Sequence, residues 1–151
     1  MSPALDWELQ IIHPVNEWAR SAQERMIMTG LTRENPTTIA FVVNCYLSNA
    51  ISTLELQTWA ADVAGSGAAH PDYLLDLTTF DAPRFHVYET LGFSPSRTFS
   101  AEENHAIYGI AYLRDREVYE SVDKARALQA LHQNPNVRTE FAAVFPFLLR
   151  G

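Results

Sequence analysis

The stretch "STLELQTWAADVAGSG", residues 52–67, carries the clearest folding signal in the chain. Ser52 followed three residues later by Glu55 is the pattern of a capping box, in which each side chain binds the other residue's backbone N–H. Ile51 and Leu56 occupy the positions of a hydrophobic staple around this pair. Apolar residues then continue at helical spacing until the sequence Gly65-Ser66-Gly67 interrupts them. The stretch therefore predicts an amphipathic helix with a well-marked start and end.

Related helix-start signals recur along the chain. Ser100 and Glu103 repeat the capping pattern and open a predicted helix that continues to about Tyr119. The apolar spacing after residue 36 predicts a further helix in the centre of the fold. Candidate helices also cover residues 16–28, 83–91, 124–132 and 135–144. Four residue–proline pairs fit a cap followed by a first-turn proline, which has no N–H to leave unpaired: His13-Pro14, Asn35-Pro36, His70-Pro71 and Asn134-Pro135.

These signals predict an all-α protein, a compact single-domain bundle of about seven or eight helices, several of them short. Residues 1–151 are expected to form one helical domain, because no shift in composition divides the chain. The segment "DWELQII", residues 6–12, remains open as a strand, although no hairpin turn with a partner strand follows it.

Composition predicts a cytoplasmic protein. No apolar run approaches the roughly 18 residues of a membrane span, and the first residues lack the basic and apolar regions of a signal peptide. Cys45 is the only cysteine and has apolar neighbours, so we expect it to pack in the core rather than to act as a nucleophile.

The charge is concentrated in the middle of the chain. The net charge is −7, and residues 52–103 contain eight acidic residues against only Arg84 and Arg97. Direct binding of nucleic acid is therefore not expected, because contacts to phosphate need clustered lysine and arginine. A basic protein partner would be attracted instead. The alternative is that the acidic residues only keep the protein soluble.

The segment "HPDYLLDL", residues 70–77, combines histidine and aspartate, which are common in metal and catalytic sites. If the segment is only the start of a helix, its residue types are already explained, because Pro71 would open the helix and Asp72 would lie in its first turn. The functional alternative is a small helical hydrolase or metal-binding enzyme that uses His70, Asp72 and Asp76. Further ligands would have to come from elsewhere, and no paired-ligand motif supplies them. We expect no enzyme and assign no catalytic, cofactor-binding or metal-binding residue.

Two other short patterns could likewise indicate either a metal or catalytic site or an ordinary feature of a helix. Glu102 and His105 have the E-x-x-H spacing of di-iron bundles, but a second copy of that motif is absent from the sequence. His86 and Glu89 are more simply an exposed pair three residues apart on a helix.

Tyrosines beside acidic residues form the second predicted binding surface. If the helix after Ser100 reaches Tyr119, then Tyr108, Tyr112, Asp115 and Tyr119 lie in one narrow sector of it. Tyrosine offers a large contact area and a hydroxyl at little entropic cost, which favours protein binding. The alternative is that a neighbouring helix covers this sector.

The segments "WAADVAGSGAAHPDYLLDL" (59–77) and "HAIYGIAYLRDREVYE" (105–120), followed by "NP" and a terminal "FPF", resemble small acidic immunity proteins of bacterial contact-dependent inhibition and related polymorphic toxin systems. The resemblance covers about two thirds of the chain and implies binding to a cognate toxin domain, commonly a nuclease with a basic surface. It assigns no residue, because these proteins share no catalytic motif. From the charge we take Asp72, Asp76 and Asp81 as interface candidates, with the four residues of the tyrosine sector. A helical adaptor protein is the remaining alternative, and the oligomeric state stays open.

Overall fold

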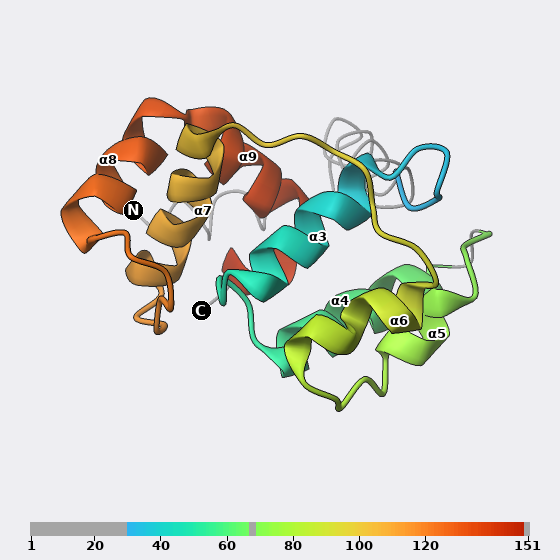
Figure 1. Ribbon diagram of the computed structural model, residues 1–151. Coiled ribbons are helices and arrows are strands. Elements are labelled where there is room, and N and C mark those ends of the chain that lie inside the picture. The colour runs from blue at the N-terminus through green and yellow to red at the C-terminus, as the bar shows by residue number, and fades with distance from the viewer. Residues whose placement is uncertain (1–29, 67–68, 150–151) are drawn as a thin grey trace, which may run out of the picture.

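The computed structural model describes residues 30–66 and 69–149, which fold into seven α-helices and two 3₁₀ helices without a strand (Figure 1). The predicted all-α fold is confirmed. The predicted helix at 16–28, the start at His13-Pro14 and the possible strand at 6–12 lie outside the described residues.

Helix α3 (Thr37–Leu47) runs through the middle of the fold, between two groups of helices (Figure 1). Eight of its 11 residues are buried, which confirms its predicted central place. Cys45 is fully buried on this helix, and burial raises the pKa of its thiol well above the ordinary value. The cysteine is therefore part of the core.

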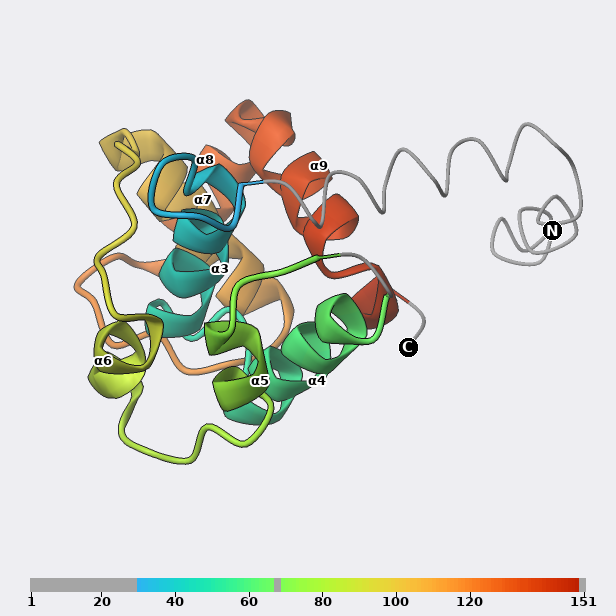
Figure 2. The same ribbon diagram turned by 90° about the vertical axis from the view of Figure 1, so that its right-hand side faces the viewer.

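The first group of helices follows α3 in the chain. It contains α4 (Thr53–Ala64), α5 (Tyr73–Leu77), the 3₁₀ helix η2 (Arg84–His86) and α6 (Val87–Leu91). Helix α5 packs against α4, and Figure 2 shows the two side by side. Both halves of the predicted capping box of α4 are present, with 3.1 Å from Glu55 N to Ser52 Oγ and 2.8 Å from Ser52 N to Glu55 Oε1.

The second group contains α7 (Ala101–Leu113), α8 (Lys124–Gln133), α9 (Pro135–Val144) and the 3₁₀ helix η3 (Pro146–Leu149). The Ser100 capping box of α7 is present as predicted. Gly109 lets α7 and α8 approach closely, because a Cβ atom there would lie 2.5 Å from the carbonyl oxygen of Ala127. One hydrophobic core joins both groups to α3, with Trp59, Tyr46 and Phe145 among its fully buried side chains.

Several predicted helix boundaries were wrong: Pro36 precedes α3 as its N-cap, and residues 83–91 divide into η2 and the short helix α6. Helix α7 ends at Leu113 rather than near Tyr119, because Asp115 adopts a left-handed conformation with φ +56° and the chain turns away. Helix α5 begins at Tyr73 rather than at Pro71. After α7 the chain is held by bonds from Arg114 to Ala50 and from Arg116 to Asn49, and local spacing cannot reveal contacts so distant in the sequence.

Candidate protein-binding surface

Two arginines hold the corner between α3 and α4. Arg84 donates hydrogen bonds to the carbonyl oxygens of Tyr46 (2.5 Å) and Ile51 (3.1 Å) and to Oδ1 of Asn49 (2.9 Å). Arg116 donates to the same Oδ1 (2.6 Å) and to the carbonyl oxygen of Asn49 (2.7 Å). Both guanidinium groups therefore bind backbone and side-chain oxygens of the fold, and both residues are only partly exposed.

Arg114 is directed inward in the same way. It donates to the carbonyl oxygen of Ala50 (2.5 Å) and to Oε1 of Glu55 (2.9 Å), and its second terminal nitrogen binds Glu55 Oε2. Burial on its own would raise the pKa of the Glu55 carboxyl. The hydrogen bonds from Arg114 and from the backbone of Ser52 outweigh burial, so the pKa is lowered overall. Glu55 is thus a charged carboxylate with its partners inside the fold.

Arg97 lies on the extended segment between α6 and α7. Its two terminal nitrogens bind the Glu140 carboxylate at 2.7 and 2.9 Å, and one of them also donates to the carbonyl oxygen of Thr37 at 3.0 Å. Its guanidinium lies over the Phe99 ring, 4.5 Å from the centroid. The hydrogen bond to Glu140 raises the pKa of Arg97, so this pair is charged and mutually neutralised.

Because these arginines are bonded to groups of the fold, they present less positive charge at the surface. Arg33 is exposed but donates to the carbonyl oxygen of Gly92. Among the described residues, the other exposed lysine and arginine side chains lie on α8 and α9, and they are Lys124, Arg126 and Arg138. The surface of α4, α5 and α6 therefore presents carboxylates without exposed lysine or arginine from those helices.

Asp72, Asp76 and Asp81 are all exposed, as an interface would require. None of their carboxylates forms a hydrogen bond or ion pair with another residue in the described ranges. Asp72 occupies the N-cap position of α5, but its side chain makes no capping bond. The chain just before Asp81 is fixed by a bond from Gln57 Nε2 to the carbonyl oxygen of Phe80, 2.8 Å.

The predicted tyrosine sector is divided by the structure. Only Tyr108 and Tyr112 lie on α7, and both are partly buried. The Tyr112 hydroxyl donates to the carbonyl oxygen of Val122 at 2.7 Å. Burial, with the charge of Glu120 adding to it, raises the pKa of Tyr108. Tyr112 is thus bonded to the non-helical chain between α7 and α8, whereas the alternative interpretation expected a neighbouring helix to cover this face.

Asp115 and Tyr119 instead follow the end of α7, and from Leu113 to Tyr119 the side chains alternate in exposure. The inward members include Arg114 and Arg116. The outward members are Leu113, Asp115, Glu117 and Tyr119, which we call the 113–119 row. The sequence "LRDREVY" does not alternate between apolar and polar residues, so local spacing gives no signal for this row.

The residues of the hydrolase alternative are not gathered into a site. His70 Nδ1 lies 3.1 Å from the carbonyl oxygen of Pro71, and His86 pairs with Glu89 at 2.7 Å. His105 Nδ1 is buried without a hydrogen-bond partner in the described ranges. Within those ranges, no group of three or more histidine, cysteine, aspartate or glutamate side chains could hold a metal ion.

The chain matches no protein-family model, no curated protein and no solved structure. No helix in residues 30–66 and 69–149 has the length and apolar character needed to cross a membrane.

Proposed function

We propose that the protein binds a basic protein domain through the carboxylates of α5 and the following loop, and acts as an immunity protein that neutralises a toxin domain. The observation that carries the proposal is the separation of charges. Arg84, Arg114 and Arg116 bond to oxygens of the fold, while Asp72, Asp76 and Asp81 are exposed and have no hydrogen-bond or ion-pair partner for their carboxylates within residues 30–66 and 69–149. The exposed surface is thus more acidic than the sequence composition alone suggests.

This arrangement suits a binding protein because a unipolar surface attracts an oppositely charged partner before contact. Such steering raises association rates to about 10⁸ M⁻¹s⁻¹ or more at low ionic strength. A nuclease is the favoured kind of target, since the face that binds phosphate must be basic. Carboxylates held on a rigid helix can occupy that face in place of nucleic acid.

The rigid attachment of α5 to the core also favours binding through its carboxylates. Ordering a flexible acidic tail on binding would cost conformational entropy, whereas carboxylates on a packed helix are already positioned. Tyr73, Leu74 and Leu77 are buried and fix α5 to the core, so Asp72 and Asp76 keep a set spacing of one helical turn.

The direct test is co-expression with a toxin domain, sought first among the genes that neighbour this one. The protein should restore growth, and the purified protein should block the nuclease activity of that domain at equal molar amounts. The association rate should fall steeply as salt rises, because exposed charges are screened. Unchanged growth arrest, or full nuclease activity with the protein in excess, would show that neutralisation of this toxin is not its function.

A further inference from the structure

Arg84 and Arg116 share one oxygen atom at the corner between α3 and α4. The Nη2 atoms of both arginines donate to Oδ1 of Asn49, at 2.9 Å from Arg84 and 2.6 Å from Arg116. This oxygen belongs to a neutral amide, so it accepts hydrogen bonds but does not cancel either positive charge. Two positively charged groups are therefore held around one uncharged acceptor.

Neither Arg84 nor Arg116 forms an ion pair with a carboxylate in residues 30–66 and 69–149. The charge of Glu55 does act on Arg116. Both oxygens of Glu55, however, are bound by Arg114, and one of them also accepts from the backbone N–H of Ser52. Three guanidinium groups at this corner are thus balanced by a single carboxylate that is already engaged.

The pKa of Arg116 reflects this excess of positive charge. Burial lowers the pKa, the charge of Glu55 opposes that effect, and the like charges of Arg84 and Arg114 lower the pKa further. A partly buried charge is costly when it lacks a partner of opposite sign. An anion beside Arg84 and Arg116 would offset both the repulsion and part of the cost of burial.

Both side chains keep N–H groups with which to bind an anion. Nε of Arg84 and Nη1 of Arg116 form no hydrogen bond with another residue in the part of the chain that the structure describes. Both arginines are partly exposed, so solvent reaches them. Arg84 is also fixed over the ring of Tyr46, 4.4 Å from its centroid, so little conformational entropy remains to be lost on binding.

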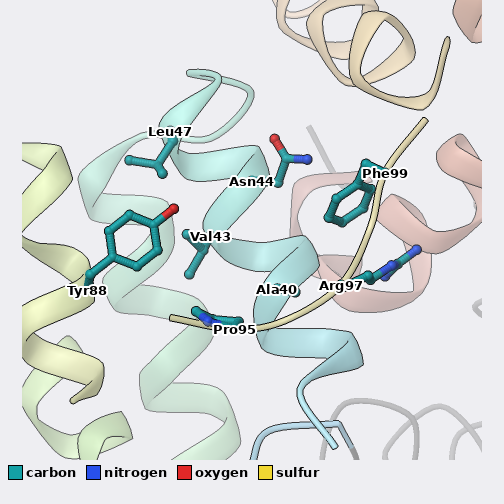
Figure 3. A pocket seen from close by; sticks show the side chains of 8 residues that line it. All are labelled: Ala40, Val43, Asn44, Leu47, Tyr88, Pro95, Arg97 and Phe99. Carbon is teal, nitrogen blue, oxygen red and sulfur yellow. The ribbon is translucent and has the colours of Figure 1, made fainter. Parts of the chain in front are cut away.

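Arg97 shows the same kind of side chain with its charge cancelled. It lies beside Phe99 at a hollow of about 180 Å³ (Figure 3). Its terminal nitrogens bind the Glu140 carboxylate at 2.7 and 2.9 Å, and one of them also donates to the carbonyl oxygen of Thr37. Backbone carbonyls thus hold all three arginines, but only Arg97 has a carboxylate of its own. It therefore serves as an internal control.

We infer that Arg84 and Arg116 form a binding site for a phosphate group. A phosphate monoester carries about −1.5 to −2 charge near pH 7 and presents three acceptor oxygens, so one group matches both positive charges. A carboxylate would neutralise only one of them. The planar N–H groups of arginine also suit phosphate oxygens geometrically. The inference does not depend on the proposed function, and inorganic phosphate and phosphate esters share the required chemistry.

The site can be tested in protein labelled with ¹⁵N-arginine by following the Nε–H signals. The probes are inorganic phosphate, O-phosphoserine and acetate, added at pH 7 and constant ionic strength. Inorganic phosphate should shift the Arg84 and Arg116 signals to saturation and bind at least tenfold more tightly than acetate. The signals of Arg97 and Arg138 should stay unchanged, because Arg97 already has a carboxylate and Arg138 is an isolated exposed position on α9.

Three variants locate the phosphate. Asn49→Asp places a carboxylate at the atom that the two guanidinium groups share, so it should weaken phosphate binding at least tenfold. Asn136→Asp is the matched control, because it adds the same charge at an exposed position on α9 and should leave binding unchanged. Arg116→Lys keeps the charge but loses the planar N–H groups, and it should weaken binding at least threefold even if Asn49→Asp does not fold. Helical circular dichroism and the melting temperature verify folding.

The outcomes decide for or against the site. Saturating shifts with inorganic phosphate or O-phosphoserine support it, and the tighter of the two identifies the ligand as the free ion or as a phosphate ester. Acetate that binds as tightly as phosphate would overturn the preference for phosphate. Equal shifts of Arg97 or Arg138 would reduce the effect to general screening of charge. Wild-type affinity in folded Asn49→Asp or Arg116→Lys would exclude a phosphate bound between Arg84 and Arg116.

Discussion

Asn49 connects three distant parts of the chain through one side chain. Its Oδ1 accepts from Arg84 and from Arg116, and its Nδ2 donates to the carbonyl oxygen of Glu117 at 2.7 Å. Its backbone has φ +62°, a left-handed conformation that asparagine tolerates better than most residues. Asparagine therefore meets a backbone requirement and a hydrogen-bonding requirement at the same position.

The two requirements can be separated by substitution. Asn49→Gly keeps the backbone conformation but removes bonds to charged donors, so it should lower the free energy of unfolding by about 1.5 to 3 kcal/mol. Asn49→Ala should cost roughly 1 kcal/mol more, because alanine is strained at positive φ. Urea denaturation measures both. Asn136→Ala, at an exposed position, is the control. Wild-type stability of Asn49→Gly would mean that the arginine bonds contribute nothing net.

At the scale of the element, Glu55 shows how one residue serves both its own helix and a neighbouring segment. It completes the capping box of α4 and also receives Arg114 from the end of α7. The capping part was predictable, because it depends on Ser52 three residues before. The arginine bond was not, because its partner is 59 residues away and nothing in the spacing points to it.

The bond between Arg114 and Glu55 predicts how the stability of the protein depends on pH. The pKa of Glu55 is lowered in the folded protein, so its stabilising effect is present above the ordinary glutamate pKa of about 4.3 and is lost as the pH falls below that value. Glu55→Gln should lower the free energy of unfolding at pH 7 by about 1.5 to 3 kcal/mol. It should also flatten the stability curve below pH 5, as followed by urea denaturation at each pH. A variant with the wild-type acid dependence would contradict this role.

The helices themselves were largely predictable, and their ends were not. Local signals such as Ser52, Ser100 and Pro135 depend on backbone groups within one turn, so sequence spacing located the starts of α4, α7 and α9. The end of α7 depends on Arg114 and Arg116 reaching the α3–α4 corner. For the same reason the outward 113–119 row could not be predicted, whereas the exposure of Asp72, Asp76 and Asp81 could.

The contact of α7 with α8 gives a second prediction at this scale. Alanine normally stabilises a helix interior by about 1 kcal/mol relative to glycine. Gly109→Ala should nevertheless destabilise the protein by about 1 to 3 kcal/mol, because the new methyl group would meet the backbone of Ala127 at 2.5 Å. Gly65→Ala is the matched control, with its nearest atom at 3.1 Å, and should change little. Thermal unfolding compares the two, and a stabilised Gly109→Ala would show that the helices can separate without cost.

On the scale of the whole molecule, the charged side chains that point into the fold differ in kind from those that face solvent. The arginines that hold the α3–α4 corner bond to oxygens of the fold, and the exposed lysine and arginine of the described residues, apart from Arg33, lie on α8 and α9. Two exposed acidic surfaces result, one around Asp76 and Asp81 and one along the 113–119 row. Net charge attracts a basic partner to both, so only a comparison at constant net charge can tell which surface the partner contacts.

Two charge reversals provide that comparison. Asp76→Lys with Asp81→Lys, and Glu117→Lys with Glu120→Lys, each change the net charge from −7 to −3 and alter only exposed side chains. If the partner docks on α5 and the following loop, the first pair should slow association at least tenfold at low salt, since like charges would then meet at the contact. The second pair should slow it much less, because it changes only the long-range field.

Association rates with the toxin domain that we propose as the partner, measured by stopped-flow fluorescence across a salt series, decide between the surfaces. Both double variants should keep the helical spectrum and a nearly unchanged melting temperature, because none of the four carboxylates forms an ion pair with a described residue. Equal slowing by both pairs would mean that net charge alone acts. A larger effect of Glu117→Lys with Glu120→Lys would move the interface to the 113–119 row, where Tyr119 is 66% exposed and would be the next residue to replace.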